Sequence, residues 1–206
     1  IENVLFKISY PAEFHAQSAV EAAMSLHAQL QAMGRSSDDI AKIVIRTQAA
    51  CMRSIDKQGP LDNPADRDHC IQYMVAVPLI FGRLTAADYE DAVAADPRID
   101  ALRARIRCVE EPQFTADYHD PDKRSIANGL SVTLSDGSVL DEVLVEYPIG
   151  HRRRRAEGIP LLEAKFRRNL ARRFDETRQQ HILAIALDQA RLEALPVHEF
   201  MDLFAA

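Results

Sequence analysis

The chain has 206 residues, 47% of them apolar, which is enough to bury a substantial core. Its 31 acidic and 25 basic side chains leave a formal net charge of -6, which argues against a polyanion as the main partner. The three cysteines never form a CxxC pair, so the sequence supports no disulfide framework, zinc site or iron–sulfur cluster and fits a reducing cytoplasm.

No stretch approaches about eighteen uninterrupted apolar residues, the length that a membrane-spanning helix needs. The longest apolar run, residues 74–81, is short and contains Pro78. The chain opens with Ile1 and lacks the regions of a signal peptide. We therefore expect no membrane segment and a piece of a longer protein.

The first half mixes helix and strand patterns. Apolar residues recur at helical spacing over residues 13–33, and Gly34 supplies the expected stop. A turn at residues 36–39 leads into residues 40–47, whose alternation and β-branched side chains predict a half-buried strand.

The next predicted helix begins with Asn63 as cap and Pro64 in the first turn, and it runs through Phe81. Pro78 is expected to kink or end this helix. Short helices are predicted over residues 86–94 and near residues 97–105.

Residues 131–146 carry the strongest β pattern, with Asp136 and Gly137 as the turn of an antiparallel hairpin. Beyond Gly158 the pattern is helical, with pieces near residues 177–192 and 197–204. One apolar stripe is predicted there, formed by Leu162, Phe166, Leu170 and Phe174. This order predicts the α+β class, with a small mixed helix and antiparallel-sheet domain over residues 1–150 and a helical C-terminal segment over residues 151–206.

Two segments place ionisable groups beside apolar or kinked sequence. Lys7 lies next to Ile8 and Tyr10, where lost hydration would lower its pKa, and Pro11 fixes the chain that presents His15 at the start of the first helix. The second segment spans residues 66–73. The residues alone suggest an acid–base site without defining a reaction.

Four blocks carry a resemblance to a known family. They are Lys-x-x-Tyr-Pro-x-x-x-His at residues 7–15, Gly-Pro-Leu-Asp-Asn-Pro-Ala-Asp-Arg-Asp-His-Cys-Ile-Gln-Tyr-Met-Val-Ala-Val-Pro-Leu at residues 59–79, Thr-Ala-Asp-Tyr-His-Asp-Pro at residues 115–121 and Glu-Tyr-Pro-Ile-Gly-His at residues 146–151. With these blocks the chain resembles the MmgE/PrpD family. The resemblance implies the small α+β domain and returning helices of a larger protein, whose main helical domain is absent here.

The implied activity is removal of water from 2-methylcitrate, giving 2-methylaconitate in propionate breakdown, without a metal cluster or other cofactor. The resemblance assigns Lys7 and His15 to the wall that this domain contributes to the active site, with Tyr73 as a further catalytic residue. It also suggests His69 as a substrate contact specific to a subgroup. A cytoplasmic homo-oligomer acting on a small tricarboxylate is expected, with neither nucleic acid nor membrane as partner.

Two further substrate contacts are predicted. Gln72 lies beside Tyr73, and Arg152 begins a run of four arginines whose forked guanidinium groups match carboxylates. Each candidate also has a structural interpretation: Lys7 as a solvated side chain, His15 as a residue near a helix start, and Tyr73 and Gln72 as buried groups that hydrogen-bond to neighbours.

Other polar residues favour structural roles. His27 falls on the apolar face of the first helix and is interpreted as a core histidine. Asp117 and His119 are interpreted as part of a loop that caps its own backbone, because they lack a spaced metal-binding partner. The basic stretch after residue 151 is interpreted as a solvated helix face, since only Phe166 interrupts it as an aromatic residue.

Two alternatives to the dehydratase stay open. One is another polycarboxylate lyase or isomerase of the same family, such as a cis-aconitate decarboxylase or an epimerase. The other is a binding or assembly module without chemistry, which would dimerise or capture a partner through the stripe of Leu162, Phe166 and Leu170.

Overall fold

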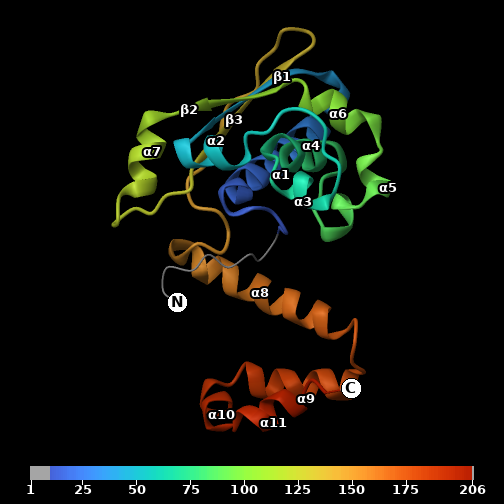
Figure 1. Cartoon of the computed structure of the whole chain (residues 1–206), viewed down its shortest axis with the longest axis vertical. Helices are drawn as coiled ribbons and strands as arrows, with labels where there is room; N and C mark the ends of the chain where they lie inside the picture. The colour runs from blue at the N-terminus through green and yellow to red at the C-terminus, as the bar shows by residue number, and fades with distance from the viewer. Residues whose placement is uncertain (1–9, 206) are drawn as a thin grey trace. The chain divides into compact units, whose positions relative to one another are not determined.

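The computed structural model describes residues 10–205 and is shown in Figure 1. Lys7 therefore lies outside the described residues. The chain divides into two compact units, one ending at Gly158 and the other beginning at Ile159, and each is taken here by itself. The predicted boundary between residues 150 and 151 falls just before the helix that crosses this division, and the assignment of domains stays a prediction.

A four-stranded sheet in the order β2-β1-β3-β4 forms the centre of the first unit. Its strands are β1 (Ile40–Thr47), β2 (Ile106–Glu110), β3 (Asn128–Leu134) and β4 (Val143–Val145). β1 pairs in parallel with β2, and the other neighbours are antiparallel. The α+β class is confirmed, while the sheet is mixed because β2, which was not predicted, returns beside β1 through the helices between them.

The predicted hairpin turn is present between β3 and β4. Gly137 has a positive φ of 87°, and its amide donates to the Leu134 carbonyl at 3.0 Å, while Asp136 Oδ1 accepts the Ser138 amide at 3.0 Å. After a bridge between Thr133 and Val139, the second arm becomes regular only at β4. The hairpin prediction is thus confirmed, with a shorter second strand than the pattern indicated.

The first predicted helix is also present. A 3-10 turn, η1 (Phe14–Ala16), leads into α1 (Gln17–Ala32), and the chain leaves the helix through Gly34 at φ 67°. Helix α1 packs against α4 (Ile71–Phe81) and against β3 and β4. Their contact forms the main core, which includes Leu26, Ile43, Met74 and Leu130.

The helix predicted over residues 64–81 is two helices. α3 (Pro64–Asp68) begins at Asn63, whose side chain accepts the Asp66 amide at 3.0 Å. The chain is extended at Cys70, with φ -128° and ψ 106°, before α4 begins. Pro78 lies inside α4, and the helix ends later, at Gly82 with φ 65°. Of the two predicted effects of Pro78, an end to the helix is wrong, because the left-handed Gly82 ends it, and a kink stays a prediction.

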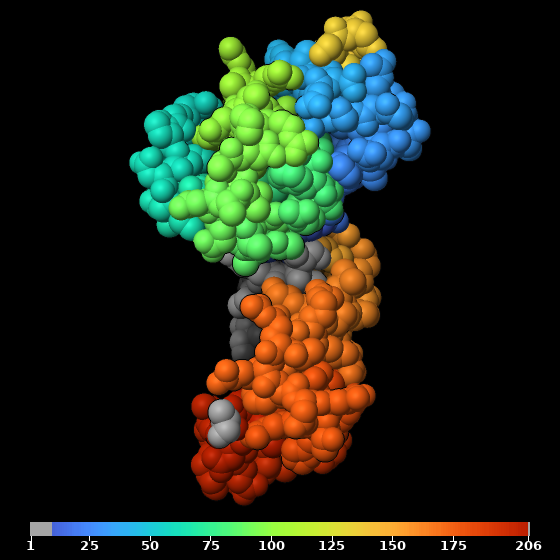
Figure 2. Space-filling model, turned by 90° about the vertical axis from the view of Figure 1, so that its right-hand side faces the viewer, coloured from blue at the N-terminus to red at the C-terminus, as the bar shows by residue number. Residues whose placement is uncertain are grey.

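Short helices surround this core. η2 (Ser37–Asp39) precedes β1, and η3 (Ala86–Tyr89), α5 (Asp91–Ala94) and α6 (Pro97–Arg103) follow α4 where short helices were predicted. In Figure 2 the segment around α5 and α6, coloured green, makes up much of the face of the first unit that is turned to the viewer. Helices α5 and α6 lie at the end of the unit opposite α7 (Pro112–His119) (Figure 1).

Helices α2 (Ala49–Ile55) and α7 (Pro112–His119) were not predicted. The interpretation of Asp117 and His119 as loop residues is wrong, since both belong to α7. Pro112 occupies the first turn of that helix, and Glu111 caps it by accepting the Gln113 amide at 3.3 Å. Asp117 forms an ion pair with Lys123 at 2.8 Å, so its carboxylate is used locally.

The remaining residues are helical, as predicted. η4 (Arg152–Arg154) leads into α8 (Arg155–Leu170), followed by α9 (Glu176–Ala186), α10 (Gln189–Ala194) and α11 (Val197–Asp202). Leu170, Ile182 and Leu183 form a small core in the second unit, against which Phe166 and Phe174 pack. Within residues 10–205, no helix is long and apolar enough to cross a membrane.

Candidate active site

His15 lies in η1 with both ring nitrogens in contact with other side chains. Its Nδ1 is 3.0 Å from Glu13 Oε1, and its Nε2 is 3.1 Å from Tyr118 Oη. The His15 amide donates to Glu13 Oε2 at 2.7 Å. His15 thus joins Glu13, two residues earlier, to Tyr118, which is 103 residues later in the chain. These three residues are called the His15 cluster below.

Glu13 fixes the tautomer of His15. Burial by itself would raise the pKa of the Glu13 carboxyl, but the hydrogen bonds and charge of His15, with a smaller contribution from His69, lower it below its ordinary value. Glu13 is therefore ionised at neutral pH and only accepts hydrogen bonds, so His15 Nδ1 carries the proton that it donates. In the neutral imidazole, Nε2 is then the acceptor of the Tyr118 hydroxyl proton.

Helix α7 places Tyr118. The hydroxyl of Thr115, on the same helix, accepts the Ala49 amide of α2 at 2.9 Å, and Glu111 just before α7 forms an ion pair with Arg46 of β1 at 2.6 Å. The parallel pairing of β1 with β2 brings the starts of α2 and α7 to the same edge of the sheet. Tyr118 therefore reaches His15, with the ring centroids 5.6 Å apart.

The backbone of His15 is also held. Asn128, which is fully buried at the start of β3, donates from Nδ2 to the His15 carbonyl at 2.8 Å and to Ser18 Oγ at 2.7 Å. Ser18 in turn donates to the Ile126 carbonyl. The buried Asn128 side chain therefore holds the backbone of η1 against β3, and this contact fixes where the His15 ring lies.

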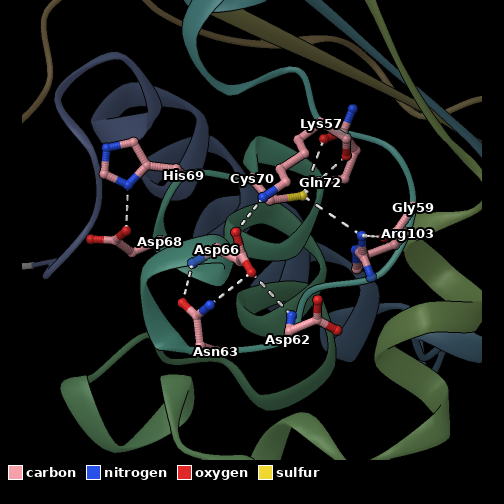
Figure 3. A network of polar contacts seen from close by, with 10 residues as sticks. All are labelled: Lys57, Gly59, Asp62, Asn63, Asp66, Asp68, His69, Cys70, Gln72 and Arg103. Atoms are coloured by element: carbon pink, nitrogen blue, oxygen red, sulfur yellow. Dashed lines mark hydrogen bonds and ion pairs between the residues drawn. The ribbon is translucent and has the colours of Figure 1, made fainter.

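His69 lies at the end of α3, and its side chain is 59% exposed. Its Nδ1 is 2.5 Å from Asp68 Oδ1, and Figure 3 shows this pair apart from the contacts that join Cys70, Gln72 and Arg103. The charge of His69 makes only the smallest contribution to the lowered pKa of Glu13. Among residues 10–205, no hydrogen bond, ion pair or ring contact joins His15 directly to His69, Tyr73 or Gln72.

Tyr73 belongs to the interior. Its side chain is 2% exposed, it stacks on Tyr89, and its hydroxyl donates to the Asp88 carbonyl at 2.5 Å. Burial raises the pKa of Tyr73 to about 12. The hydroxyl thus donates to a backbone group of η3, and within residues 10–205 it makes no hydrogen bond to another predicted site residue.

Gln72 is buried on the same helix and donates to Asp56 Oδ1 at 2.5 Å. Its Oε1 lies 3.4 Å from Cys70 Sγ, and Arg103, close by, donates to the Gly59 carbonyl at 3.0 Å (Figure 3). Gln72 and Arg103 line a cavity of about 400 Å³, and Tyr73 and Arg103 line a second of about 220 Å³. Neither cavity is lined by His15, Glu13 or Tyr118.

Arg152 is exposed in η4, next to the buried His151. Burial lowers the pKa of His151, and the neighbouring positive charge of Arg152 lowers it further. His151 Nε2 lies 3.2 Å from the Arg124 carbonyl, and its ring packs on Tyr147 with a centroid separation of 4.7 Å. The substrate-binding role of Arg152 stays a prediction.

The cysteines are closer in the fold than their sequence spacing indicated. The Gln72 side chain lies beside two of them, with Oε1 3.4 Å from Cys70 Sγ and Nε2 3.8 Å from Cys108 Sγ, and burial raises the pKa of Cys108. Burial likewise raises the pKa of Cys51 to about 12, which keeps it in the unreactive thiol form. Among residues 10–205, no group of three or more His, Cys, Asp or Glu side chains is arranged to hold a metal ion.

Sequence reasoning missed Glu13, Tyr118 and Asn128. Glu13 carried a usable signal, since an acidic residue two positions before a histidine at a helix start can cap both its amide and its ring. Tyr118 belongs to one of the four family blocks, but the residues around it in the sequence do not indicate that α7 packs near η1. Asn128 precedes the hairpin and has no sequence signal of its own.

The MmgE/PrpD C-terminal domain matches residues 10–190 of the chain. The chain belongs to the MmgE/PrpD family. It is 75% identical to the 2-methylcitrate dehydratase of Cupriavidus necator over 205 residues, which cover 100% of the chain and 42% of that protein. It is also 65% identical to the 2-methylcitrate dehydratase of Escherichia coli strain K12, with 99% of the chain and 42% of that protein covered.

A fungal relative, the mitochondrial 2-methylcitrate dehydratase of Yarrowia lipolytica, is 59% identical over 99% of the chain and 39% of its own length. The chain thus spans about two fifths of the length of the curated relatives it matches. The family membership predicted from the four sequence blocks is confirmed. The His15 cluster lies within the matched MmgE/PrpD residues.

Proposed function

We propose that this chain is the C-terminal part of a hydro-lyase that converts 2-methylcitrate to 2-methylaconitate. The observation that carries the proposal is 75% identity over the whole chain to a protein named 2-methylcitrate dehydratase. The His15 cluster supports it, because it offers groups that hold and move protons at the start of α1.

The reaction needs two proton transfers. A base takes a proton from the carbon beside a carboxylate, and an acid protonates the leaving hydroxyl as the double bond forms. We assign His15 to this proton chemistry, with Lys7 binding a substrate carboxylate and offsetting the charge that builds on it in the transition state. The role of Lys7 rests on the family resemblance, and Tyr73, Gln72, His69 and Arg152 remain further candidates.

Most of the complete protein is not represented in this chain, since the chain covers 42% of the length of its bacterial relatives. We propose that the missing part is a helical domain that supplies the opposite wall of the active site. The isolated chain should therefore bind substrate weakly and show negligible turnover, whereas the full-length protein should be active. Wild-type turnover by the isolated chain would contradict this division.

The wider setting is proposed from the family resemblance. We place the full-length enzyme in propionate breakdown through the methylcitrate route, in the cytoplasm and as a homo-oligomer. The Yarrowia lipolytica relative is named as mitochondrial, and this location is not carried over to the present chain. Sedimentation of the full-length protein tests the oligomer, and a monomer at micromolar concentration would contradict it.

Product analysis tests the activity. Full-length protein is incubated with 2-methylcitrate, and the products are followed by proton NMR. Appearance of the 2-methylaconitate vinylic methyl and methylene signals at the expense of substrate supports dehydration. Release of carbon dioxide from cis-aconitate without conversion of 2-methylcitrate would instead favour a decarboxylase, and no turnover of either compound would favour a module without chemistry.

A further inference from the structure

The hydrogen bonds of His15 leave no ring nitrogen for a substrate. Imidazole has two ring nitrogens, and each makes at most one good in-plane hydrogen bond. Nδ1 lies 3.0 Å from Glu13 Oε1, and Nε2 lies 3.1 Å from Tyr118 Oη. The His15 side chain is only 13% exposed, so there is little room to approach it in another way.

Tyr118, unlike His15, can make a further hydrogen bond to a substrate. A phenol oxygen carries one proton and two lone pairs, so a single contact with His15 leaves the oxygen able to make another. The Tyr118 side chain is partly exposed at the C-terminal end of α7. In residues 10–205, His15 Nε2 is the hydrogen-bond partner found for Tyr118 Oη. The accessible end of the His15 cluster is therefore the Tyr118 hydroxyl.

We propose that Glu13, His15 and Tyr118 form a proton relay in which the Tyr118 hydroxyl, and not the imidazole, meets the leaving hydroxyl of the substrate. This deepens the dehydratase function proposed above and rests on it. Tyr118 is then a catalytic residue, and Glu13 is a positioning residue that acts through His15.

In the proposed step His15 starts doubly protonated, so that Nε2–H donates to the Tyr118 oxygen and leaves the Tyr118 proton free for the substrate. The Oη–H bond of Tyr118 breaks, and its proton goes to the hydroxyl of the substrate, which departs as water when the C–O bond breaks. The Nε2–H proton of His15 passes to the Tyr118 oxygen and restores the phenol, while Nδ1 keeps the proton that it donates to Glu13. A second base of the complete site takes the C–H proton, and the electron pair of that bond forms the C=C bond.

The relay predicts the opposite outcome from direct catalysis by His15 when the Tyr118 hydroxyl is removed. In full-length protein, Tyr118→Phe should lower kcat for 2-methylcitrate by about 100- to 10,000-fold, the range for loss of a general acid, and change KM little. If His15 met the substrate itself, the same variant would free Nε2 and leave kcat unchanged or higher. That result would overturn the proposal.

Tyr89→Phe is the matched control, because the Tyr89 hydroxyl is buried without a hydrogen-bond partner and lies outside the His15 cluster. It removes the same atom and should retain wild-type kcat. Glu13→Gln should lower kcat at constant KM, and Glu13→Asp should recover part of the loss. If Glu13 has only a structural role, these variants would change thermal stability and leave kcat intact, which would overturn its part in the relay.

A readout independent of turnover separates this inference from the proposed function. In the isolated chain, the ¹⁵N resonance of His15 Nε2 should report its hydrogen bond with the Tyr118 hydroxyl, and it should therefore shift in Tyr118→Phe but not in Tyr89→Phe. Wild-type protein that is inactive on 2-methylcitrate would reject the function while this resonance still reports the contact. An Nε2 resonance that is identical in wild type and Tyr118→Phe would reject the relay.

Discussion

His15 and Tyr73 were both predicted as parts of one site, and the surroundings of these two residues differ in what their polar groups contact. In the cluster, a carboxylate, an imidazole and a phenol contact one another through side-chain atoms. Around Tyr73, the hydroxyl donates to a backbone carbonyl, and Arg67 likewise donates to the Tyr89 carbonyl at 2.6 Å. The first arrangement can move a proton along titratable groups, whereas the second holds short helices against α4.

Under the proposed assignment of His15 to the proton chemistry, burial and polarity alone do not identify a catalytic residue. Tyr73 and His15 are both shielded from water, yet only His15 lies between two groups that can exchange protons with it. The pKa of Tyr73 is raised by burial, which favours its neutral, hydrogen-bonding form. A chain of titratable side chains joined across distant parts of the sequence is therefore the better guide to a functional site.

His15→Gln should give the largest loss of activity. Glutamine keeps a polar side chain but cannot relay a proton, so kcat of the full-length protein should fall about 100- to 10,000-fold. Steady-state assays with 2-methylcitrate measure this. His27→Gln is a matched control, since His27 Nδ1 contacts the Leu79 carbonyl at 3.0 Å inside the fold, and this variant should lose stability but keep kcat. Equal losses of kcat in both variants would remove the distinction between the two regions.

Tyr73→Phe should act on stability more than on turnover. It leaves the buried Asp88 carbonyl without its donor, which costs about 1–3 kcal/mol of unfolding free energy. Urea unfolding of the isolated chain measures this loss, and kcat of the full-length variant should stay near that of wild type. A loss of kcat as large as that of His15→Gln would instead return Tyr73 to the acid–base set.

Glu13→Gln should lower stability at neutral pH by roughly 1.5 kcal/mol, because a charge-assisted hydrogen bond to His15 is lost. The pKa of Glu13 in the folded chain lies below its ordinary value of 4.5, so its ionised form favours folding. This contribution is present above pH 4.5 and is lost as the pH falls through the lowered pKa of the folded state.

The difference in urea midpoint between wild type and Glu13→Gln should therefore shrink below pH 4.5. A matched substitution, Glu193→Gln on the exposed surface of α10, provides the baseline for general charge effects. A difference between wild type and Glu13→Gln that grows as the pH falls would contradict the lowered pKa of Glu13.

Much of the fold was predictable because its signals are local. The hairpin depends on Asp136 and Gly137, and α1 depends on its apolar spacing and Gly34, so both follow from neighbouring residues. α2 and α7 were missed because they are short, and the break between α3 and α4 was missed because Cys70 carries no breaker signal. β2 was missed because its parallel partner β1 lies about sixty residues earlier, and such pairing leaves little trace in a single short strand.

The candidate site was predictable only where its residues carry local signals, because the remaining contacts depend on pairing between distant strands. His15 stood out through Pro11 and its place before a helix, and the family resemblance supported it. Tyr118 becomes its partner only because β1 pairs with β2 and the following α7 turns back toward η1. Tyr73 and Gln72 were named as candidates beside His15, and their contacts with Asp88 and Asp56 become visible only in the structure.

A double-mutant cycle in the full-length protein tests most directly whether the His15 cluster acts as one unit. Turnover of 2-methylcitrate is measured for wild type, Glu13→Gln, Tyr118→Phe and the double variant. The relay predicts that the double variant loses no more of kcat than the worse single variant, because either change already interrupts the same proton transfer. Losses that multiply in the double variant would show that Glu13 and Tyr118 act independently, and the relay would be rejected.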